Sequence, residues 1–331
     1  MSTPAAPHIS EAADSRGLSD FIRRNWTLVA PVTALIVLII AFTIMDPRFL
    51  QPENFLNILR QSSVLLVLAM ASTAVILMGS IDLSVGSVLT FTAFVGALAG
   101  MNTGSTLWLL LLPLTGMVCG LINGALVAYG RLPSFLVTLG TLFVFDGLSK
   151  YIAGGRPVPL APGGVVSAFS GDFLGIPVVA LWAILILLIS VAVARWTRFG
   201  RYLFALGGNE KTSRLSGVPV DRYKMYAFMV AGSLAGFAGL LQLARSSSAS
   251  PDMGANFLLP AIAAVVMGGT PLSGGIGGPL RTVIGVLIIA ILGNGMIIAS
   301  VDPFLQNVVQ GFVVIAAVAL TMDRQKMTLV K

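Results

Sequence analysis

Ten apolar runs of 12 to 24 residues divide this sequence, and they constrain the possible folds more than any other feature. A helix rises ~1.5 Å per residue, so about 20 apolar residues cross the ~30 Å hydrocarbon core of a bilayer. The chain is 56% hydrophobic and only 10% charged, whereas soluble domains carry about 25% charged residues. The sequence therefore predicts an all-α, polytopic integral membrane protein.

The predicted spans are residues 26–45, 56–78, 85–100, 106–129, 133–153, 176–194, 225–244, 257–268, 280–299 and 304–322. The run 257–268 covers only ~18 Å at helical rise, so we expect either a half-span or a span that the following glycine-rich stretch continues. Ten crossings place both termini on the same side of the membrane. If the segments 79–87 and 257–278 are re-entrant, the count falls to nine or eight.

The distribution of basic residues orients these spans. Of the 20 Lys and Arg residues, 15 fall on the side that holds both termini and 5 on the other side. Positive charge near span ends favours the cytoplasmic side, which predicts that both termini are cytoplasmic. It also explains the net charge of +7 without nucleic acid. We expect residues 1–25 to be a disordered tail, 26–322 a transmembrane domain, and 323–331 a second tail.

Several residue types that carry chemistry in other proteins are scarce. Cys119 lies within an apolar run and His8 in the polar N-terminal segment, so these side chains cannot assemble a metal cluster. The first apolar run follows Arg23 and Arg24 and should serve as an uncleaved span rather than a signal peptide. A phosphate-binding Gly-x4-Gly-Lys-Ser/Thr pattern is absent from the sequence. We therefore expect a transport protein and not an enzyme, with its energy supplied by another chain.

The longest polar interval between spans is the basic segment 197–224, which we expect to be cytoplasmic. Within it, the residues from Asn209 to Leu215 predict a short helix, because Asn209 can cap it and Gly217 can end it in a left-handed turn. A short helix held at the membrane surface between two spans is a shape that another protein can grip.

The same segment contains the pattern Gly-Arg-x5-Gly-Gly-Asn-x4-Arg-Leu-Ser-Gly-Val, from Gly200 to Val218. It resembles the coupling loop of ABC-importer permeases of the ribose, xylose and galactose group, within the broader superfamily of branched-chain amino acid and sugar permeases. Three further stretches are similar to that family, GSIDLSVGS (79–87), PSFLVTLGT (133–141) and MGGTPLSGGIGG (267–278). Together they cover the chain from about the second span to its end.

The resemblance implies a partner set and a location. The partners are a cytoplasmic ABC ATPase subunit that carries ATP and magnesium, an extracytoplasmic sugar-binding protein and a second, usually identical, permease chain. This chain itself would hold no cofactor. It would lie in the bacterial inner membrane, form a bundle similar to those of cobalamin and siderophore importers, and move a monosaccharide or related polyol by alternating access. The residues expected to couple it to the ATPase are Gly200, Arg201, Gly207, Gly208, Asn209, Glu210, Arg214, Leu215 and Gly217.

Two of the motifs repeat each other. GSIDLSVGS and the stretch around MGGTPLSGG coincide at Gly79 and Gly268, and at Ser84 and Ser273, with a constant offset of 189. Internal repeats and broken helices are typical of the functional centres of transporters, although two inside turns that both need Gly and Ser would look the same. Asp82 is the single carboxylate in these motifs, and we interpret it as a helix cap rather than a contact to sugar hydroxyls.

Neutral polar residues within the spans could serve a sugar pathway or only hydrogen-bond between helices. Asp146 and Lys150 lie four residues apart and should neutralise each other on one helix face. The candidate pathway residues are Asp82, Ser84, Asn123, Thr138, Asp146, Asn294 and Gln310. Gly232, Gly236 and Gly239 should let the seventh span pack closely on a neighbour.

Two other functions remain open at this point. A branched-chain amino acid permease of the same superfamily would share the architecture, and the ligand that stimulates ATP hydrolysis would separate it from a sugar permease. An ion-coupled secondary carrier would need no ATPase. The spans lack a chain of buried carboxylates and histidines, which argues against proton coupling.

Overall fold

The computed structural model describes residues 26–160 and 163–321, and helices account for most of this part of the chain. The long elements are α2 (Trp26–Met45), α3 (Pro52–Leu77), α4 (Val85–Thr103), α5 (Leu112–Ala128), α6 (Ser134–Ile152), α7 (Val178–Trp196), α10 (Val220–Ser246), α11 (Ala255–Met267), α12 (Pro279–Ile298) and α13 (Pro303–Thr321). The shorter helices are η1 (Pro47–Leu50), η2 (Thr106–Leu111), η3 (Gly164–Ala168), α8 (Arg198–Gly208) and α9 (Glu210–Leu215). The tails expected at 1–25 and 323–331 lie outside the described residues.

The polytopic helical fold is confirmed, since seven helices are long and apolar enough to cross a membrane. Three shorter apolar helices, Val29–Met45, Ala255–Met267 and Pro303–Ala316, accompany them. Each of the ten predicted spans thus contains a helix, although α10 begins five residues earlier than the predicted Met225. That all ten cross the bilayer, with both termini inside, stays a prediction.

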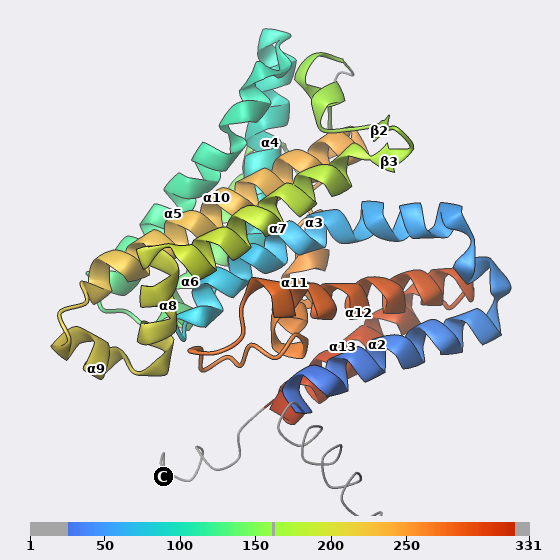
Figure 1. Ribbon diagram of the computed structural model, residues 1–331. Coiled ribbons are helices and arrows are strands. Elements are labelled where there is room, and N and C mark those ends of the chain that lie inside the picture. The colour runs from blue at the N-terminus through green and yellow to red at the C-terminus, as the bar shows by residue number, and fades with distance from the viewer. Residues whose placement is uncertain (1–25, 161–162, 322–331) are drawn as a thin grey trace, which may run out of the picture.

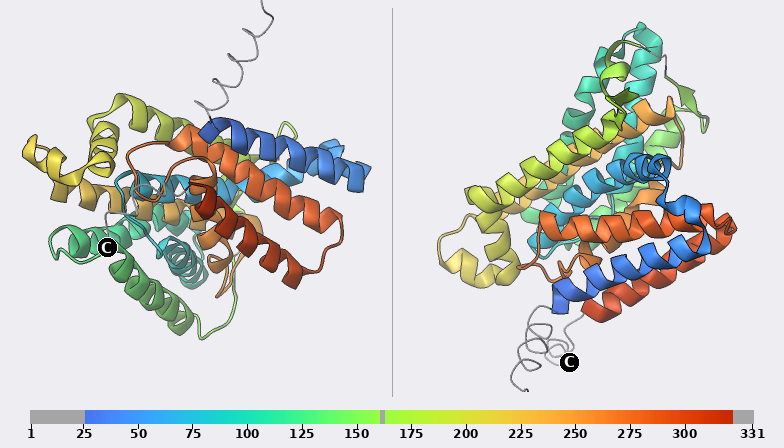
Figure 2. Two further views of the ribbon diagram at one scale, coloured as in Figure 1. Left: turned by 90° about the horizontal axis from the view of Figure 1, so that it is seen from below. Right: turned by 45° about the vertical axis from the view of Figure 1, so that its right-hand side comes forward.

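The elements sort to two ends of the bundle. Figure 1 shows α8 and α9 at one end, together with the beginning of α2 and the end of α13. At the other end lie η1 and a small hairpin of β2 (Asp172–Phe173) and β3 (Ile176–Pro177), and the right-hand view of Figure 2 agrees. The short elements between the long helices therefore lie at the two ends, as expected if the helices between them cross a bilayer.

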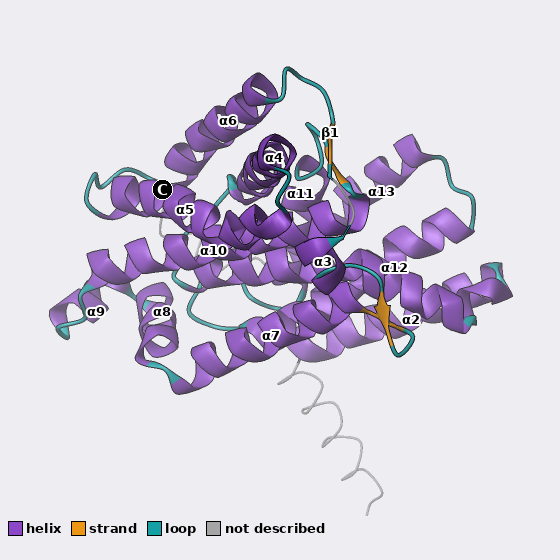
Figure 3. Cartoon of the chain, turned by 90° about the horizontal axis from the view of Figure 1, so that it is seen from above, coloured by secondary structure: helices purple, strands orange, loops and turns teal. Residues whose placement is uncertain are grey.

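The centre of the bundle is the long helix α10, which makes its most extensive contact with α5 (Figure 3). The contact is made of backbone, because a Cβ added to Gly116 or Gly120 of α5 would collide with the carbonyl oxygen of Gly232 or Phe228 of α10. Close approach of this kind is how helices associate in lipid, where apolar side chains gain little by leaving their surroundings. The predicted packing role of Gly232 is confirmed.

The short helix α11 is preceded by partly buried chain that is not helical. Strand β4 (Ser248–Ala249) pairs antiparallel with β1 (Val158–Pro159), with Ala249 opposite Val158. The chain then turns, and the backbone N–H of Gly254 donates to the hydroxyl of Thr90 at 3.0 Å. Ala249, Met253 and Gly254 are buried in this segment, whereas Asp252 is exposed, so the chain before α11 is covered only in part.

The α5–α10 contact predicts a sharp difference between two glycines. Gly120→Ala should lower the free energy of unfolding by ~1–3 kcal/mol, because the new methyl group meets α10 backbone that cannot yield. Gly293→Ala on α12 is the matched control, since its Cβ would meet open space, and removing a helical glycine should stabilise by up to ~1 kcal/mol. Thermal unfolding of the purified variants measures both, and equal midpoints would refute the contact.

Candidate functional site

The basic segment 197–224 forms two helices joined at a corner, which we call the elbow (α8 and α9). Thr197 begins α8, and its hydroxyl accepts a hydrogen bond from the Gly200 N–H at 3.2 Å. Gly200, Leu203 and Leu206 repeat every third residue and are buried, whereas Arg198 and Arg201 on the opposite face are exposed. The period of three is typical of an amphipathic helix. The sequence analysis did not predict α8, although the small and apolar residues at every third position indicate it.

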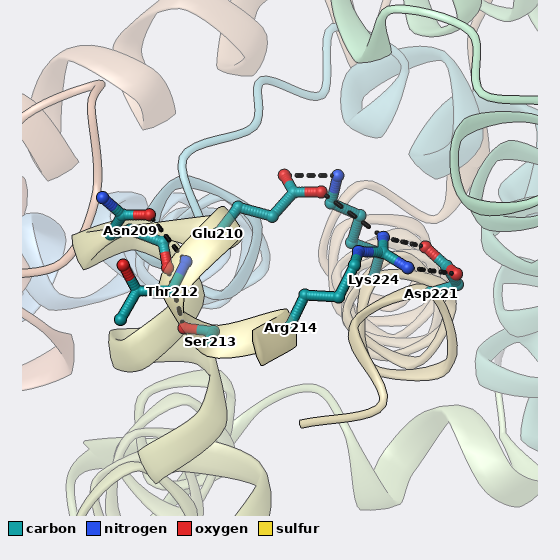
Figure 4. Close-up of polar contacts among 7 residues, drawn as sticks. All are labelled: Asn209, Glu210, Thr212, Ser213, Arg214, Asp221 and Lys224. Carbon is teal, nitrogen blue, oxygen red and sulfur yellow. Dashed lines mark hydrogen bonds and ion pairs between the residues drawn. The ribbon is translucent and has the colours of Figure 1, made fainter. Parts of the chain in front are cut away.

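The second arm of the elbow, α9, matches the prediction closely. The Asn209 side chain accepts a hydrogen bond from the Thr212 N–H at 2.9 Å (Figure 4). Gly217 adopts a φ of +82° after the helix ends. The predicted helix with an Asn209 cap is therefore confirmed. Leu215, at the last position of α9, is 82% exposed, so an apolar side chain projects from an otherwise polar arm.

Ion pairs tie α9 to the first turns of α10. Arg214 donates two hydrogen bonds to the Asp221 carboxylate, at 2.7 and 3.0 Å, and lies 3.7 Å from Glu210 (Figure 4). Lys224 pairs with Glu210 at 2.7 Å. The hydrogen bonds to Asp221 raise the pKa of Arg214 above its usual value. Because the guanidinium binds both carboxylate oxygens, the relative orientation of the two side chains is fixed.

Most of the expected coupling residues are on the open surface of the elbow. Those exposed are Arg201, Gly208, Asn209, Glu210, Arg214, Leu215 and Gly217. Gly200 is buried at the corner between α7 and α8, and Gly207 is half-buried at the end of α8. The elbow therefore has an outward face and an inward face, and the two glycines belong to the inward one.

Gly207 is the point where the elbow meets the rest of the bundle. A Cβ on this residue would collide with the carbonyl oxygen of Leu77, at the end of α3, and with the amide nitrogen of Gly275. These last two groups are themselves hydrogen-bonded, since the Gly275 N–H donates to Leu77 O at 3.0 Å. We call this backbone contact among Leu77, Gly207 and Gly275 the glycine junction. It joins two of the four stretches that carry the family resemblance, 200–218 and 267–278, and Leu77 lies two residues before a third.

The two repeated motifs have matching turns in the structure. Gly79 follows α3 with a φ of +77°, and Gly269 follows α11 with a φ of +87°. In both turns the next residue, Ser80 or Thr270, donates its N–H to a carbonyl five residues earlier, each at 3.2 Å. The equivalent positions are 190 residues apart, so the offset of 189 read from the sequence is wrong by one residue.

Four of the seven candidate pathway residues surround the first of these turns. The Asp82 carboxylate accepts from the N–H and the hydroxyl of Ser84, at 2.8 and 2.6 Å. The Asn123 amide of α5 donates to the Ser84 hydroxyl at 2.8 Å. The Thr138 hydroxyl of α6 lies 2.9 Å from the carbonyl of Ser134 in its own helix and 3.3 Å from the carbonyl of Ile81. Asp82 thus closes a turn just before α4 inside a buried cluster. The N-cap residue of α4 is Ser84, and no side chain caps the helix, so the predicted Asp82 cap is wrong.

The other three candidates lie elsewhere. Asp146 pairs with Lys150 at 2.9 Å, as predicted, and Lys150 also lies 3.5 Å from Asp252. Asn294 is buried on α12, and its side-chain oxygen has no hydrogen-bond partner among the described residues. Gln310 is half-buried on α13. The structure therefore gathers one polar cluster at the first turn and leaves these residues apart from it.

Comparison with known proteins matches residues 54–318 to the family described as branched-chain amino acid transport system, permease component. The ribose import permease protein of Bacillus subtilis (strain 168) is 42% identical over 301 residues, 90% of this chain and 93% of that protein. The ribose import permease protein of Escherichia coli (strain K12) is 37% identical, over 88% of this chain and 92% of that protein. The D-allose transport system permease protein of the same strain is 35% identical, over 89% and 91%. No solved structure matches the chain.

The glycine junction predicts that two adjacent glycines differ in their tolerance. Gly207→Ala should undock α8, because the methyl group meets backbone of α3 and of the loop that contains Gly275. Gly208→Ala should be tolerated, since its Cβ would meet nothing within 4 Å. Trypsin cleavage at Lys211 and Arg214 should be faster in the Gly207→Ala variant alone. Equal cleavage rates in the two variants would contradict the junction.

The buried cluster predicts a specific cost for losing one hydroxyl. Ser84→Ala leaves the Asn123 amide without its partner and removes one donor from Asp82, which should destabilise by ~1–3 kcal/mol. Ser149→Ala is the control, because that buried hydroxyl only donates to a carbonyl of its own helix. Thermal unfolding midpoints of the two variants provide the comparison, and a midpoint for Ser84→Ala no lower than that of the control would rule out the cluster as a stabilising network.

Proposed function

Because the chain belongs to the family of permease components of branched-chain amino acid transport systems, we propose that it is the membrane-spanning subunit of an ABC importer for a monosaccharide. The main support for this proposal is the similarity to ribose and allose permeases along almost the whole chain. A ribose-like pentose, a hexose or a related polyol is the substrate. Hydroxyl-rich, uncharged substrates suit a bundle whose buried polar residues are mostly neutral.

In this proposal the membrane topology has ten crossings, with both termini in the cytoplasm of a bacterial inner membrane. The uneven distribution of basic residues supports that orientation. The arrangement in Figure 1 supports it as well, because the beginning of α2 and the end of α13 lie at the end of the bundle that carries the elbow. The bundle would then be of the kind found in cobalamin and siderophore importers.

A cytoplasmic ATPase subunit binds magnesium and ATP and grips the outward face of the elbow. This face offers Arg201 and Leu215, together with the α9 arm that the Arg214–Asp221 ion pair fixes to α10. Movement of the elbow reaches the bundle by two contacts, through the ion pairs to α10 and through the glycine junction to α3. Binding of ATP thus biases an equilibrium between inward-open and outward-open states.

A second, identical chain pairs with the first along α6. This helix is mostly exposed and carries Asp146, a half-buried pathway candidate, whereas Thr138 on the same helix is buried within the chain. Seen from above and from below, α6 and α7 lie on opposite faces of the bundle (Figures 2 and 3). A partner over α6 would leave α7 facing lipid and would place the pathway between the two chains, where a sugar-binding protein can deliver its ligand from outside.

Reconstitution of the complete importer tests the proposal. Liposomes that contain this chain, its ATPase and its binding protein should take up D-ribose or D-allose only when ATP is supplied on the side of the ATPase. The same liposomes without the ATPase are the control. Uptake of L-leucine in place of sugar would identify a branched-chain amino acid permease, and sugar uptake driven by an ion gradient without the ATPase would identify a secondary carrier.

A further inference from the structure

The hairpin formed by β2 and β3 is the most exposed apolar feature at the end of the bundle opposite the elbow. Asp172 pairs with Pro177 and Phe173 with Ile176, and Leu174 and Gly175 form the turn between them. The hairpin projects from the bundle beside the beginning of α7 (Figures 1 and 2). Leu174 is 87% exposed and Phe173 60%, so neither side chain is explained by packing within the chain.

The turn itself is unfavourable for leucine. Leu174 has a φ of +52° and Gly175 a φ of +79°, and positive φ at both central residues defines the type I′ turn. Asparagine and glycine adopt that conformation readily, whereas a side chain branched beyond Cβ does so at a cost. A strained and solvent-exposed leucine at a hairpin tip gains nothing from its own chain, which points to a contact outside it.

Two interactions hold the hairpin in place. Arg60 of α3 donates to both carboxylate oxygens of Asp172, at 2.9 and 3.0 Å. In the chain just before β2, the Trp182 indole N–H of α7 donates to the carbonyl of Ala168 at 2.8 Å. The base is thus anchored to α3 and α7, and Arg60 neutralises the one charge within the hairpin. An apolar tip on a neutralised base can approach a low-dielectric surface at small electrostatic cost.

The hairpin is continuous with an exposed apolar surface of α7, which faces lipid in the proposed dimer. Pro177 ends β3 and Val178 begins α7 directly. Only 17% of the apolar window of α7 is buried inside the bundle, the lowest share among the seven candidate spans. Leu181, Ile184, Leu185 and Leu188 are exposed along it. An apolar strip therefore runs along α7 and ends at the hairpin tip.

We propose that Phe173, Leu174 and Ile176 insert into the lipid leaflet on the side opposite the elbow and anchor the beginning of α7 in the membrane. The assignment to that leaflet rests on the membrane orientation given under the proposed function. A lipid surface fits better than a protein pocket, because the tip offers no side-chain hydrogen-bond group and continues the lipid-facing strip of α7.

Quenching by brominated lipid tests the insertion. In a Cys119→Ser background, Leu174→Cys is labelled with bimane and the protein is placed in nanodiscs with phospholipids brominated on the acyl chains. Emission from the label at 174 should be blue-shifted relative to emission from a label at position 167. It should also be quenched in the brominated discs relative to discs without bromine. Ser167→Cys, on an exposed position of η3 in the same interval between α6 and α7, is the control and should be quenched less. Phe173→Cys repeats the measurement at a position with ordinary backbone geometry.

Each result has a separate meaning. Labels at 173 and 174 that are quenched no more than the label at 167 would overturn the proposal. So would emission that shifts only when the extracytoplasmic binding protein is added, because the tip would then be a protein contact. An impermeant thiol reagent applied to sealed vesicles assigns the leaflet, and sugar uptake by the unlabelled importer tests the proposed function independently of the hairpin.

Discussion

The backbone contact of Gly207 with Leu77 and Gly275 is the constraint on which the functional account depends. It brings the end of α8 against the end of α3 and against the loop between α11 and α12 with no side chain between them. Backbone atoms cannot change rotamer to absorb a displacement, so in the proposed mechanism a push on α8 moves its neighbours. The polar turn that holds Asp82 and Ser84 begins only a few residues beyond Leu77, which places the elbow next to the buried cluster.

Close backbone contact at glycine also holds other helices of this chain together. Lipid gives apolar side chains little reason to leave it, so close helix association relies on backbone approach and on hydrogen bonds. Gly116 and Gly120 provide that approach between α5 and α10, and Asn123 on α5 adds a hydrogen bond to Ser84. Through α10, which carries the ion pairs of α9, the elbow also connects to α5, whose Asn123 donates to Ser84. In the proposed mechanism, both paths of contact lead to Ser84.

Much of this fold could be predicted because its signals are local. Apolar runs produce helices in a membrane protein, so each predicted span contains one, and the Asn209 cap needs only its own neighbours. The helix α8 escaped prediction because one position of its buried period is Gly200 and because Gly207 and Gly208 end the helix, and glycine is typical of loops. The offset of 189 was wrong because it aligned the two motifs by matching residue types. In the structure, the hydrogen bonds at the ends of α3 and α11 make the two turns equivalent at an offset of 190.

The site was predicted less completely than the fold, for a related reason. The residues Asp82, Ser84, Asn123 and Thr138 do meet, but which polar residues converge depends on how four helices pack, and span positions do not encode that. The glycine junction could not be foreseen either, because contacts between backbones leave no pattern of side chains. Asn294 and Gln310 were chosen by residue type alone, and the structure places them apart from the cluster.

The most direct test of the account is a distance measurement on the assembled importer by electron paramagnetic resonance. Spin labels at Lys211 on α9 and Ile276 in the glycine-rich loop report across the junction, and labels at Lys211 and Ser167 report between the two ends of the bundle. If the junction transmits motion, ATP binding should leave the 211–276 distance unchanged while the 211–167 distance shifts. A 211–276 distance that changes with nucleotide would show that the elbow slides over the bundle, and would contradict the account.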